Sequence, residues 1–437
     1  MKPADTTAPA TPETPAAARR TPWFWVPSLY FSQGIPYVIV MTLSVVMYKR
    51  LGISNTDIAL YTSWLYLPWV IKPLWSMVVE GTGTRRGWTL ATEVLLAGAL
   101  GLLAVAVGGV DQLWGTVFVL ALLAFLSATH DVAADGFYLA ALDDRQQAFF
   151  VGIRGTAYRI ANIVGRGLLV MLAGTIETAT GDVRTSWRWV YAVLGVVFLA
   201  TAWYHAAVLP RPEADRRRAG PVVSFAALVG PVVSFFRKPG IVPILAFLLL
   251  YRLAEAQLVS LVSPFLLDDR SSGGLGLTTT EVGFIYGTLG IAALSLGGIL
   301  GGILVARDGL GRWLWPMALA INLPNLAYVW LAATQPENVW AIGLSVGLEQ
   351  FGYGFGFTAY MVACMVFARG PHQTVHYALC TGFMAAGMML PGMVSGWLQE
   401  LLGYPRFFAW VMVATIPGLV ATAFIPIDAA EGQRQEP

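Results

Sequence analysis

The fold is decided by residues 113–141, which read LWGTVFVLALLAFLSATHDVAADGFYLAA. The stretch is long enough to cross a bilayer as one helix, because about 20 apolar residues span the hydrocarbon core. Its second half carries Asp131 and Asp135. Charges at such depth are rare in membrane helices, and they face the interior of the bundle or a water-filled pathway rather than lipid. The stretch therefore predicts one helix of a multi-pass membrane protein.

The same pattern recurs along the chain. Apolar segments separated by short polar turns fall at residues 23–48, 57–79, 88–108, 148–174 and 188–209, and again at 240–267, 280–306, 313–333, 338–367, 375–402 and 407–427. Their lengths and hydropathy are typical of membrane-spanning helices. We therefore predict an all-α membrane protein with about twelve transmembrane helices in two six-helix halves.

The composition agrees with this reading and excludes other classes. Hydrophobic residues make up 57% of the chain and charged residues 12%, whereas a soluble domain carries about 25% charged residues. The net charge of +2 is scattered between apolar segments, so we expect no nucleic-acid partner. Cys364 and Cys380 lack the spacing of metal ligands. With no nucleophile-and-base set within the spans either, we expect a chain that is not an enzyme and has no cofactor or metal.

The segments outside the spans divide the chain into five parts. Residues 1–22, rich in Pro, Ala and Thr, are expected to be a disordered tail, and residues 428–437 form a second tail. Residues 23–209 and 240–427 are the two predicted halves. Between them, residues 210–239 begin with the hydrophilic run RPEADRRRAG and end with an apolar piece that suits an interfacial helix. We predict that this segment is a cytoplasmic linker.

Basic residues indicate the orientation. Lys and Arg concentrate in the tails and in the loops on the side of both termini, as at Arg85, Arg86, Arg307 and Arg312. Because cytoplasmic loops are enriched in basic residues, we expect both termini to be cytoplasmic. The loops EGTGTRR (80–86) and RDGLGR (307–312) also occupy corresponding places in the two halves, which favours an internal repeat.

Charged residues inside the predicted spans are the candidate functional residues. At ~2.5–3.5 kcal/mol for each lipid-facing charge at mid-depth, they cannot all face lipid. We expect them to pair with one another or to face water. They are Lys72, Arg154, Arg159, Arg166, Arg252, Glu93, Asp131, Asp135, Glu255 and Glu349.

Depth within the spans permits some of these charges to pair, as matches in depth rather than as contacts. In an antiparallel hairpin that turns near Arg145, Asp131 matches Arg159 in depth and Asp135 matches Arg154. Lys72 and Glu93 lie near the inner ends of their spans, and we expect them to form a structural ion pair.

Four carboxylates are candidates for proton coupling, because a buried carboxylate can take up a proton when its cationic partner moves away. They are Asp131, Asp135, Glu255 and Glu349. His130 adds a titratable group next to Asp131, although a hydrogen-bonded packing role suits it equally well.

Basic and aromatic residues within the spans are candidates for substrate binding. Arg159, Arg252 and Arg154 could hold a carboxylate of the substrate, since a guanidinium binds carboxylates in a bidentate manner. The aromatic residues Trp64, Trp69, Tyr353 and Tyr360 could stack on a sugar ring, although aromatic residues near span ends are also typical interfacial anchors. Tyr158, next to Arg159, is a further candidate for substrate binding.

Several segments resemble those of the AmpG muropeptide permeases. They are FSQGIPY (31–37), KPLWS (72–76), RRGWTLAT (85–92), ATHDVAADGFYLAAL (128–142), YRLAEA (251–256) and TEVGFIYGTLGI (280–291). The segment at 128–142 is the most specific, although acetyl-CoA transporters share a similar one. His130 stands where glutamine is usual in the permeases.

The resemblance implies the major facilitator fold with alternating access between the halves. It also implies proton-driven import of anhydro-muropeptides, a step of peptidoglycan recycling, across a bacterial inner membrane by a monomer. Asp131, Asp135, Arg159 and Glu349 fall at matching family positions. The partners would then be a sugar-peptide substrate, protons and the lipid bilayer. The alternative is transport of another amphiphilic anion, such as a siderophore or an acyl-CoA.

Overall fold

A computed structural model describes residues 21–72, 76, 79, 82–109, 112–212, 215 and 225–427, and within these ranges every regular element is helical. Of the predicted tails at 1–22 and 428–437, residues 1–20 and 428–437 lie outside the described residues, and Pro22 begins a short 3-10 helix, η1 (Pro22–Phe24). Part of the predicted linker at 210–239, residues 213–214 and 216–224, also lies outside the described residues. The apolar end of that linker is a helix, α11 (Phe225–Phe236).

The first half is built from long helices, some of which pass through a short segment of wider π-helix. The elements are η1 (Pro22–Phe24), α1 (Val26–Val38), η2 (Ile39–Leu43), α2 (Ser44–Arg50), α3 (Asn55–Trp64), α4 (Leu67–Val70), α6 (Arg85–Ala106), α7 (Gln112–Ala141), α8 (Asp144–Ile163), η3 (Val164–Leu169), α9 (Val170–Thr180) and α10 (Val183–Val208).

The second half repeats this construction. Its elements are α12 (Ile241–Leu250), α13 (Leu253–Leu267), η5 (Arg270–Ser272), α14 (Thr279–Val282), η6 (Gly283–Leu289), α15 (Gly290–Asp308), α16 (Leu310–Asn322), η7 (Leu323–Asn325), α17 (Leu326–Thr334), α18 (Val339–Ala368), α19 (Gln373–Leu402), α20 (Tyr404–Val413) and α21 (Thr415–Phe424).

Eleven helical stretches among the described residues are long and apolar enough to cross a membrane. They coincide with the segments expected from the sequence, except at residues 57–79. There α3 ends at Trp64 and α4 begins at Leu67, where Pro68 lacks the N–H that would continue the helix. Since residues 73–75, 77–78 and 80–81 are outside the described part, the twelfth span stays a prediction.

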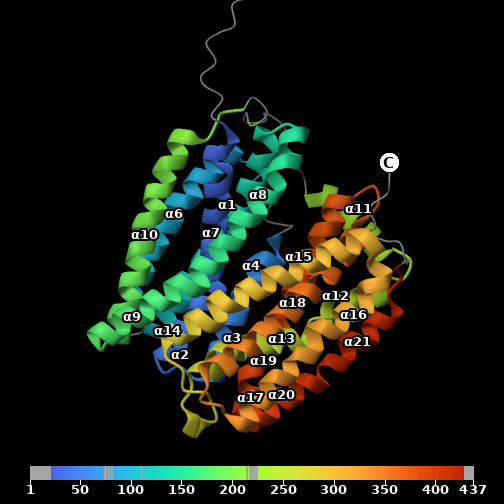
Figure 1. The fold of residues 1–437 in the computed structure, drawn as a ribbon. Helices are drawn as coiled ribbons and strands as arrows, with labels where there is room; N and C mark the ends of the chain where they lie inside the picture. Colours follow the sequence, from blue (N-terminus) through green and yellow to red (C-terminus); the bar gives the residue numbers. More distant parts are fainter. Residues whose placement is uncertain are drawn as a thin grey trace, which may run out of the picture.

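The helices gather into two bundles (Figure 1). In the first, α6 packs against α7 and α10, and α1 packs against α7 and α8. In the second, α18 packs against α15 and α16. The bundles meet where α3 and α4 lie against α19, η3 against η6, α9 against α14, and α2 against α13.

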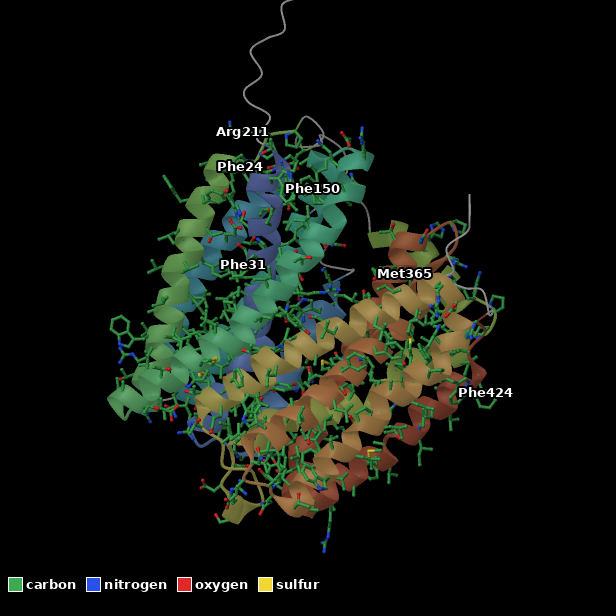
Figure 2. All side chains as sticks on the ribbon, in the orientation of Figure 1. Phe24, Phe31, Phe150, Arg211, Met365 and Phe424 are labelled. Atoms are coloured by element: carbon green, nitrogen blue, oxygen red, sulfur yellow. The ribbon has the colours of Figure 1, made fainter. Side chains whose placement is uncertain are left out.

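Side chains cover the bundles in the manner of a membrane protein (Figure 2). Large apolar side chains such as Trp203, Leu344 and Phe424 are 70–78% exposed on the outside, where lipid would cover them. The largest buried apolar cluster runs from Leu43 in the first half to Phe265 and Phe408 in the second. The apolar core therefore continues across the junction between the halves.

Polar contacts between the halves gather at one end, which we call the closed end. There the Asn55 amide donates to Gln399 (2.6 Å) and to the Tyr404 hydroxyl (2.9 Å), and Lys49 pairs with Asp268 at 2.5 Å. Every hydrogen bond and ion pair that the structure describes between residues of the two halves lies at this end: the remaining ones are Thr56 with Glu400 and Thr279 with Glu177.

Two glycines allow the backbones of the halves to approach closely. A β-carbon at Gly396 in α19 would lie 2.0 Å from the carbonyl oxygen of Asn55, and one at Gly287 in η6 would lie 2.0 Å from that of Arg166. Any larger residue at these positions would push the halves apart. Their seam is thus built for direct backbone contact at the closed end and near mid-span.

Candidate functional site

Two carboxylates of α7 face cations from neighbouring spans. Asp131 accepts a hydrogen bond from the Trp69 indole (3.2 Å) and lies 3.6 Å from the Lys72 ammonium. One turn later on the same face, Asp135 lies 3.3 Å from Arg154 and accepts from the Tyr30 hydroxyl at 3.0 Å.

These contacts confirm one expected pair and overturn two. The pairing of Asp135 with Arg154 is confirmed. The ion pair expected between Lys72 and Glu93 is wrong, and Asp131 pairs with Lys72 rather than with Arg159. Depth along a span fixes the level of a side chain but not the direction in which it points around the helix, and both wrong pairings were matched on depth alone.

Glu93 instead belongs to a buried cluster within the first half. Its Oε1 lies 2.6 Å from His205 Nδ1 and 3.4 Å from His130 Nε2, and His205 Nε2 lies 2.9 Å from the Ser28 hydroxyl. Glu93 and both imidazoles are fully buried. A buried carboxylate held between two imidazoles ties α6, α7 and α10 together, and His130 has the packing role that the sequence left open.

We expect Glu93→Leu to lower the free energy of unfolding by about 3–5 kcal/mol, because it leaves two buried imidazoles without their carboxylate. The measurement is thermal unfolding of the purified protein in detergent. Glu337→Leu is the matched control, since Glu337 is exposed in a loop. Equal melting temperatures for the two variants would contradict the structural role of the cluster.

Arg252 is the central cation of the second half. It lies at the break between α12 and α13 and is only 6% exposed. Its guanidinium carbon lies 4.8 Å from the ring centre of Phe357 and 5.2 Å from that of Tyr353, whose hydroxyl it also contacts as a donor. Cation–π contacts of this kind hold a guanidinium in place while part of its donor edge stays available.

Two buried carboxylates of the second half, Glu255 and Glu349, form no ion pair with any described residue. Neither carboxyl oxygen of Glu255 has a hydrogen-bond partner among the described residues, and Glu255 interacts electrostatically with both Glu349 and Arg252. Glu349 accepts hydrogen bonds from the Tyr328 hydroxyl (3.2 Å) and the Gln350 amide (3.0 Å), which are both neutral donors. The second half therefore holds acids without a bonded cation, in contrast to Asp131 and Asp135.

Arg166 and several tyrosines from both halves form a further group of candidate residues. Arg166 lies in η3, opposite η6 of the other half, and π-helical segments are frequent at functional sites. Tyrosines from both halves lie close enough to Arg166 or Arg252 to interact electrostatically. They are Tyr66 and Tyr158 of the first half and Tyr286 and Tyr353 of the second, with Tyr37 beside them.

The sequence reading missed most of this group. Tyr37, Tyr66 and Tyr286 were not among its candidates, and Arg166 was counted as a charge without a role. A usable signal was present, because Tyr37 and Tyr286 fall within the segments FSQGIPY and TEVGFIYGTLGI, on which the family resemblance rests.

The remaining candidates lie in different surroundings. Arg159 is exposed and has no hydrogen bond or ion pair within the described part of the chain, and Trp64 is 50% exposed at the end of α3. Tyr158 packs beside Gly34 of α1. Tyr360 is fully buried, donates to the carbonyl oxygen of Leu248 (2.7 Å) and stacks on Phe247, so here it is a packing residue.

The chain is similar to known membrane transporters. The sequence model of the Major Facilitator Superfamily matches residues 28–379. Over 399 residues the chain is 27% identical to the anhydromuropeptide permease of Escherichia coli K12, which covers 90% of this chain and 77% of that protein. It is 26% identical over 409 residues to a Rickettsia conorii protein described as transporter AmpG 4, covering 90% of this chain and 93% of that one.

Solved structures share the fold at lower identity. A bacterial homologue of the human lysosomal transporter Spinster, in an inward-facing and unoccupied conformation, is 14% identical and aligns over 94% of this chain and 96% of its own, with a TM-score of 0.67. The nucleoside transporter NupG is 16% identical and aligns over 91% and 97%, also with a TM-score of 0.67. At these identities the likeness concerns the fold alone.

Proposed function

Because the chain belongs to the Major Facilitator Superfamily, we propose that it is a proton-coupled importer of anhydro-muropeptides. The coarser part of this statement is established by family and fold. The chain is a multi-pass membrane transporter related to the anhydromuropeptide permease, and it is not an enzyme. The substrate, the coupling ion, the inner-membrane location and the cytoplasmic termini belong to the proposal.

The observation that carries the proposal is the setting of Arg252. Its guanidinium is buried between two aromatic rings at a helix break, and it interacts electrostatically with Tyr66 of the other half. An anionic sugar-peptide fits such groups, because a guanidinium binds a carboxylate and tyrosine rings stack on a sugar. Similarity to the E. coli permease over 90% of the chain favours a muropeptide among such anions.

Substrate would reach and leave the site by alternating access, in which the site opens to one side of the membrane at a time. We place the closed end on the outer side of the membrane, since basic loops favour cytoplasmic termini. In this state the halves are joined outside, and Arg252, Arg166 and the tyrosines would be reached from the cytoplasm. Rocking of the halves about the site would break the contacts of Lys49 and Asn55 and open the outer side.

Protons would be carried by the acids of the second half. Burial favours the neutral form of a carboxylate that lacks a bonded cation, because the charged form loses its hydration. Glu255 and Glu349 meet this condition, whereas Asp131 and Asp135 face Lys72 and Arg154. We assign the transported proton to Glu255 and Glu349, and we assign to Asp131 and Asp135 ion pairs that can rearrange as the halves move.

The test of substrate is uptake of labelled anhydro-muropeptide by cells that lack their own permease. We expect uptake when this protein is produced and none when a protonophore is added. Absence of uptake by well-expressed protein would overturn the muropeptide assignment. The same cells would then be tested with siderophores and acyl-CoA, the other amphiphilic anions that suit the site.

A reversible cross-link at the closed end should stop transport. Thr56 and Glu400 meet there, with the Thr56 hydroxyl 2.6 Å from the Glu400 carboxylate. We expect a short thiol cross-linker on the Thr56→Cys, Glu400→Cys double variant to reduce uptake to background, because the outer side can no longer open.

Reduction of a cleavable cross-linker should restore uptake. The single variants are the controls, and the native Cys364 and Cys380 are buried. Unchanged uptake after complete cross-linking would show that the halves need not separate at this end.

A further inference from the structure

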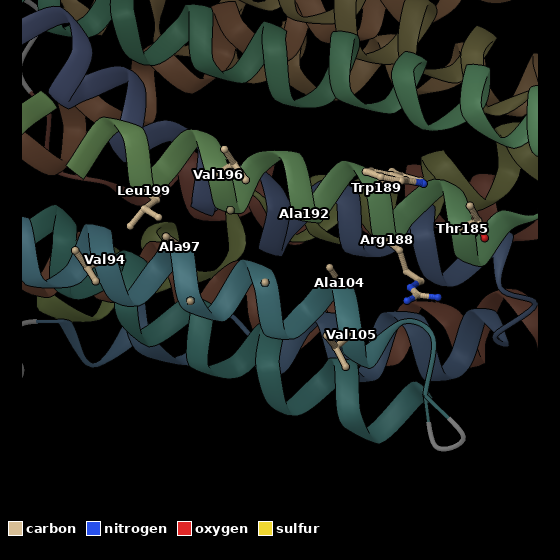
Figure 3. Close-up of a pocket in the computed structure, with 13 residues that line it drawn as sticks. Val94, Ala97, Ala104, Val105, Thr185, Arg188, Trp189, Ala192, Val196 and Leu199 are labelled. Atoms are coloured by element: carbon tan, nitrogen blue, oxygen red, sulfur yellow. The ribbon is translucent and has the colours of Figure 1, made fainter. Parts of the chain in front are cut away.

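A cavity lies away from the site between the halves, on the outside of the first bundle. It is a groove of about 770 Å³ along the seam of α6 and α10 (Figure 3). Its walls are almost entirely apolar, and it continues into a second hollow of about 590 Å³ that shares Val94, Val196 and Leu199. Since this face is outside the junction of the halves, the groove opens toward lipid.

Glycines form the floor of the groove, and helix packing accounts for only part of them. A β-carbon at Gly195 in α10 would lie 3.2 Å from the carbonyl oxygen of Ala97, so Gly195 permits close contact with α6. At Gly98 and Gly101 in α6 a β-carbon would meet nothing within 4 Å. Glycine weakens a helix interior relative to alanine. Gly98 and Gly101 therefore leave open space on the outer side of α6 that a larger side chain would fill.

One end of the groove carries a cation. Arg188 reaches from α10 toward the end of α6, where its guanidinium lies about 3.3 Å from the position of a β-carbon on Gly108 (Figure 3). The guanidinium has no hydrogen bond or ion pair within the described part of the chain, and no acidic residue lines the groove. Beside it Trp189 is 59% exposed, as is usual for tryptophan at a membrane interface.

We propose that this groove binds an anionic glycerophospholipid, with an acyl chain between α6 and α10 and its phosphate on Arg188. The apolar walls match a hydrocarbon chain, and the guanidinium matches a phosphate, which it binds through two parallel hydrogen bonds. A second copy of this chain fits less well. A two-fold dimer through the seam, with its axis along the membrane normal, would bring two Arg188 side chains to the same depth.

Native mass spectrometry of the purified full chain in detergent tests the proposal. Phosphatidylglycerol and phosphatidylethanolamine with identical acyl chains are added in separate titrations. We expect phosphatidylglycerol to bind at least about tenfold more tightly, equivalent to about 1.4 kcal/mol. Arg188→Gln should remove this preference, whereas Arg184→Gln, an exposed arginine of the same helix that does not line the groove, should keep it.

A second variant tests the groove independently of the charge. Gly101→Leu fills the floor and should weaken binding of both lipids, whereas Gly302→Leu, at an exposed glycine of α15 with equally open surroundings, should not. Equal affinity of the intact protein for the two lipids would overturn the proposal, as would an unchanged preference in Arg188→Gln. A lipid-free dimer that Gly101→Leu dissociates would show that a second copy occupies the groove.

Discussion

We expect the accumulation of muropeptide against its gradient to be lost when Glu349 is replaced by glutamine, while exchange of substrate across the membrane should persist. Glutamine preserves the shape of the side chain and can still accept a hydrogen bond from Tyr328, but it cannot bind and release a proton. If Glu349 shares the transported proton with Glu255, the Glu349→Gln variant still binds substrate. It can no longer use the proton gradient to drive accumulation. This is the largest effect expected from one isosteric change.

Proteoliposomes separate the two activities. With an imposed pH gradient we expect the intact protein to concentrate labelled substrate and Glu349→Gln to reach only equilibrium. In a counterflow assay without a gradient, the substrate exchange rates of the intact protein and of Glu349→Gln should differ by less than about threefold, because the variant keeps its substrate site. Glu337→Gln, on an exposed loop, is the control. Concentrative uptake by Glu349→Gln would contradict the assignment of the transported proton to Glu349. Asp131 would then be the next candidate carrier, and Asp131→Asn would test it.

Replacement of Arg252 by lysine should raise the KM for muropeptide by ~10- to 100-fold, the loss expected when a charge-assisted bidentate contact becomes a single one. Lysine keeps the positive charge beside Glu255 but lacks the planar fork, and it cannot lie between Phe357 and Tyr353 in the same way. The effect should fall mainly on KM, because proton uptake by the acids is preserved.

Concentration dependence of initial uptake measures this change. Calorimetric binding to the purified protein checks that it concerns affinity. Arg406→Lys is the matched control, since Arg406 is exposed at the start of α20 and distant in sequence from the site. An unchanged KM in Arg252→Lys would show that the substrate anion is held elsewhere, and the exposed Arg159 would be examined first.

Hydropathy predicted the fold because lipid imposes one simple requirement on each span. Stretches such as 113–141 must be apolar over about 20 residues, and this can be read without knowing any neighbour. The segment 57–79 was harder to read, since Pro68 interrupts the helix after Trp64. Hydropathy also gave no sign of the helix break at Arg252, because the residues on both sides of it, within 240–267, are apolar.

The candidate site was predictable in its residue types but less so in its partners. One hairpin argument matched Asp135 with Arg154 correctly and Asp131 with Arg159 wrongly, because a hairpin fixes the depth of a side chain but not the direction in which it points. Glu93 was assigned to Lys72, yet its true partners, His130 and His205, come from other helices. The spacing of charges along the sequence does not predict which spans pack together, because that depends on the tertiary structure.

The tyrosines were missed for a different reason. Aromatic residues are common throughout membrane spans, so Tyr66 carries no distinctive signal, and Tyr286 carries one only through the family segment in which it lies. Their significance arises only when η3 and η6 bring Arg166 and residues of both halves together.

The central claim is that muropeptide and protons cross together. The most direct measurement records the pH inside proteoliposomes that contain only this protein, when anhydro-muropeptide is added outside. The account predicts internal acidification that requires substrate and that is absent in the Glu349→Gln variant. Uptake of substrate without any proton movement would contradict it.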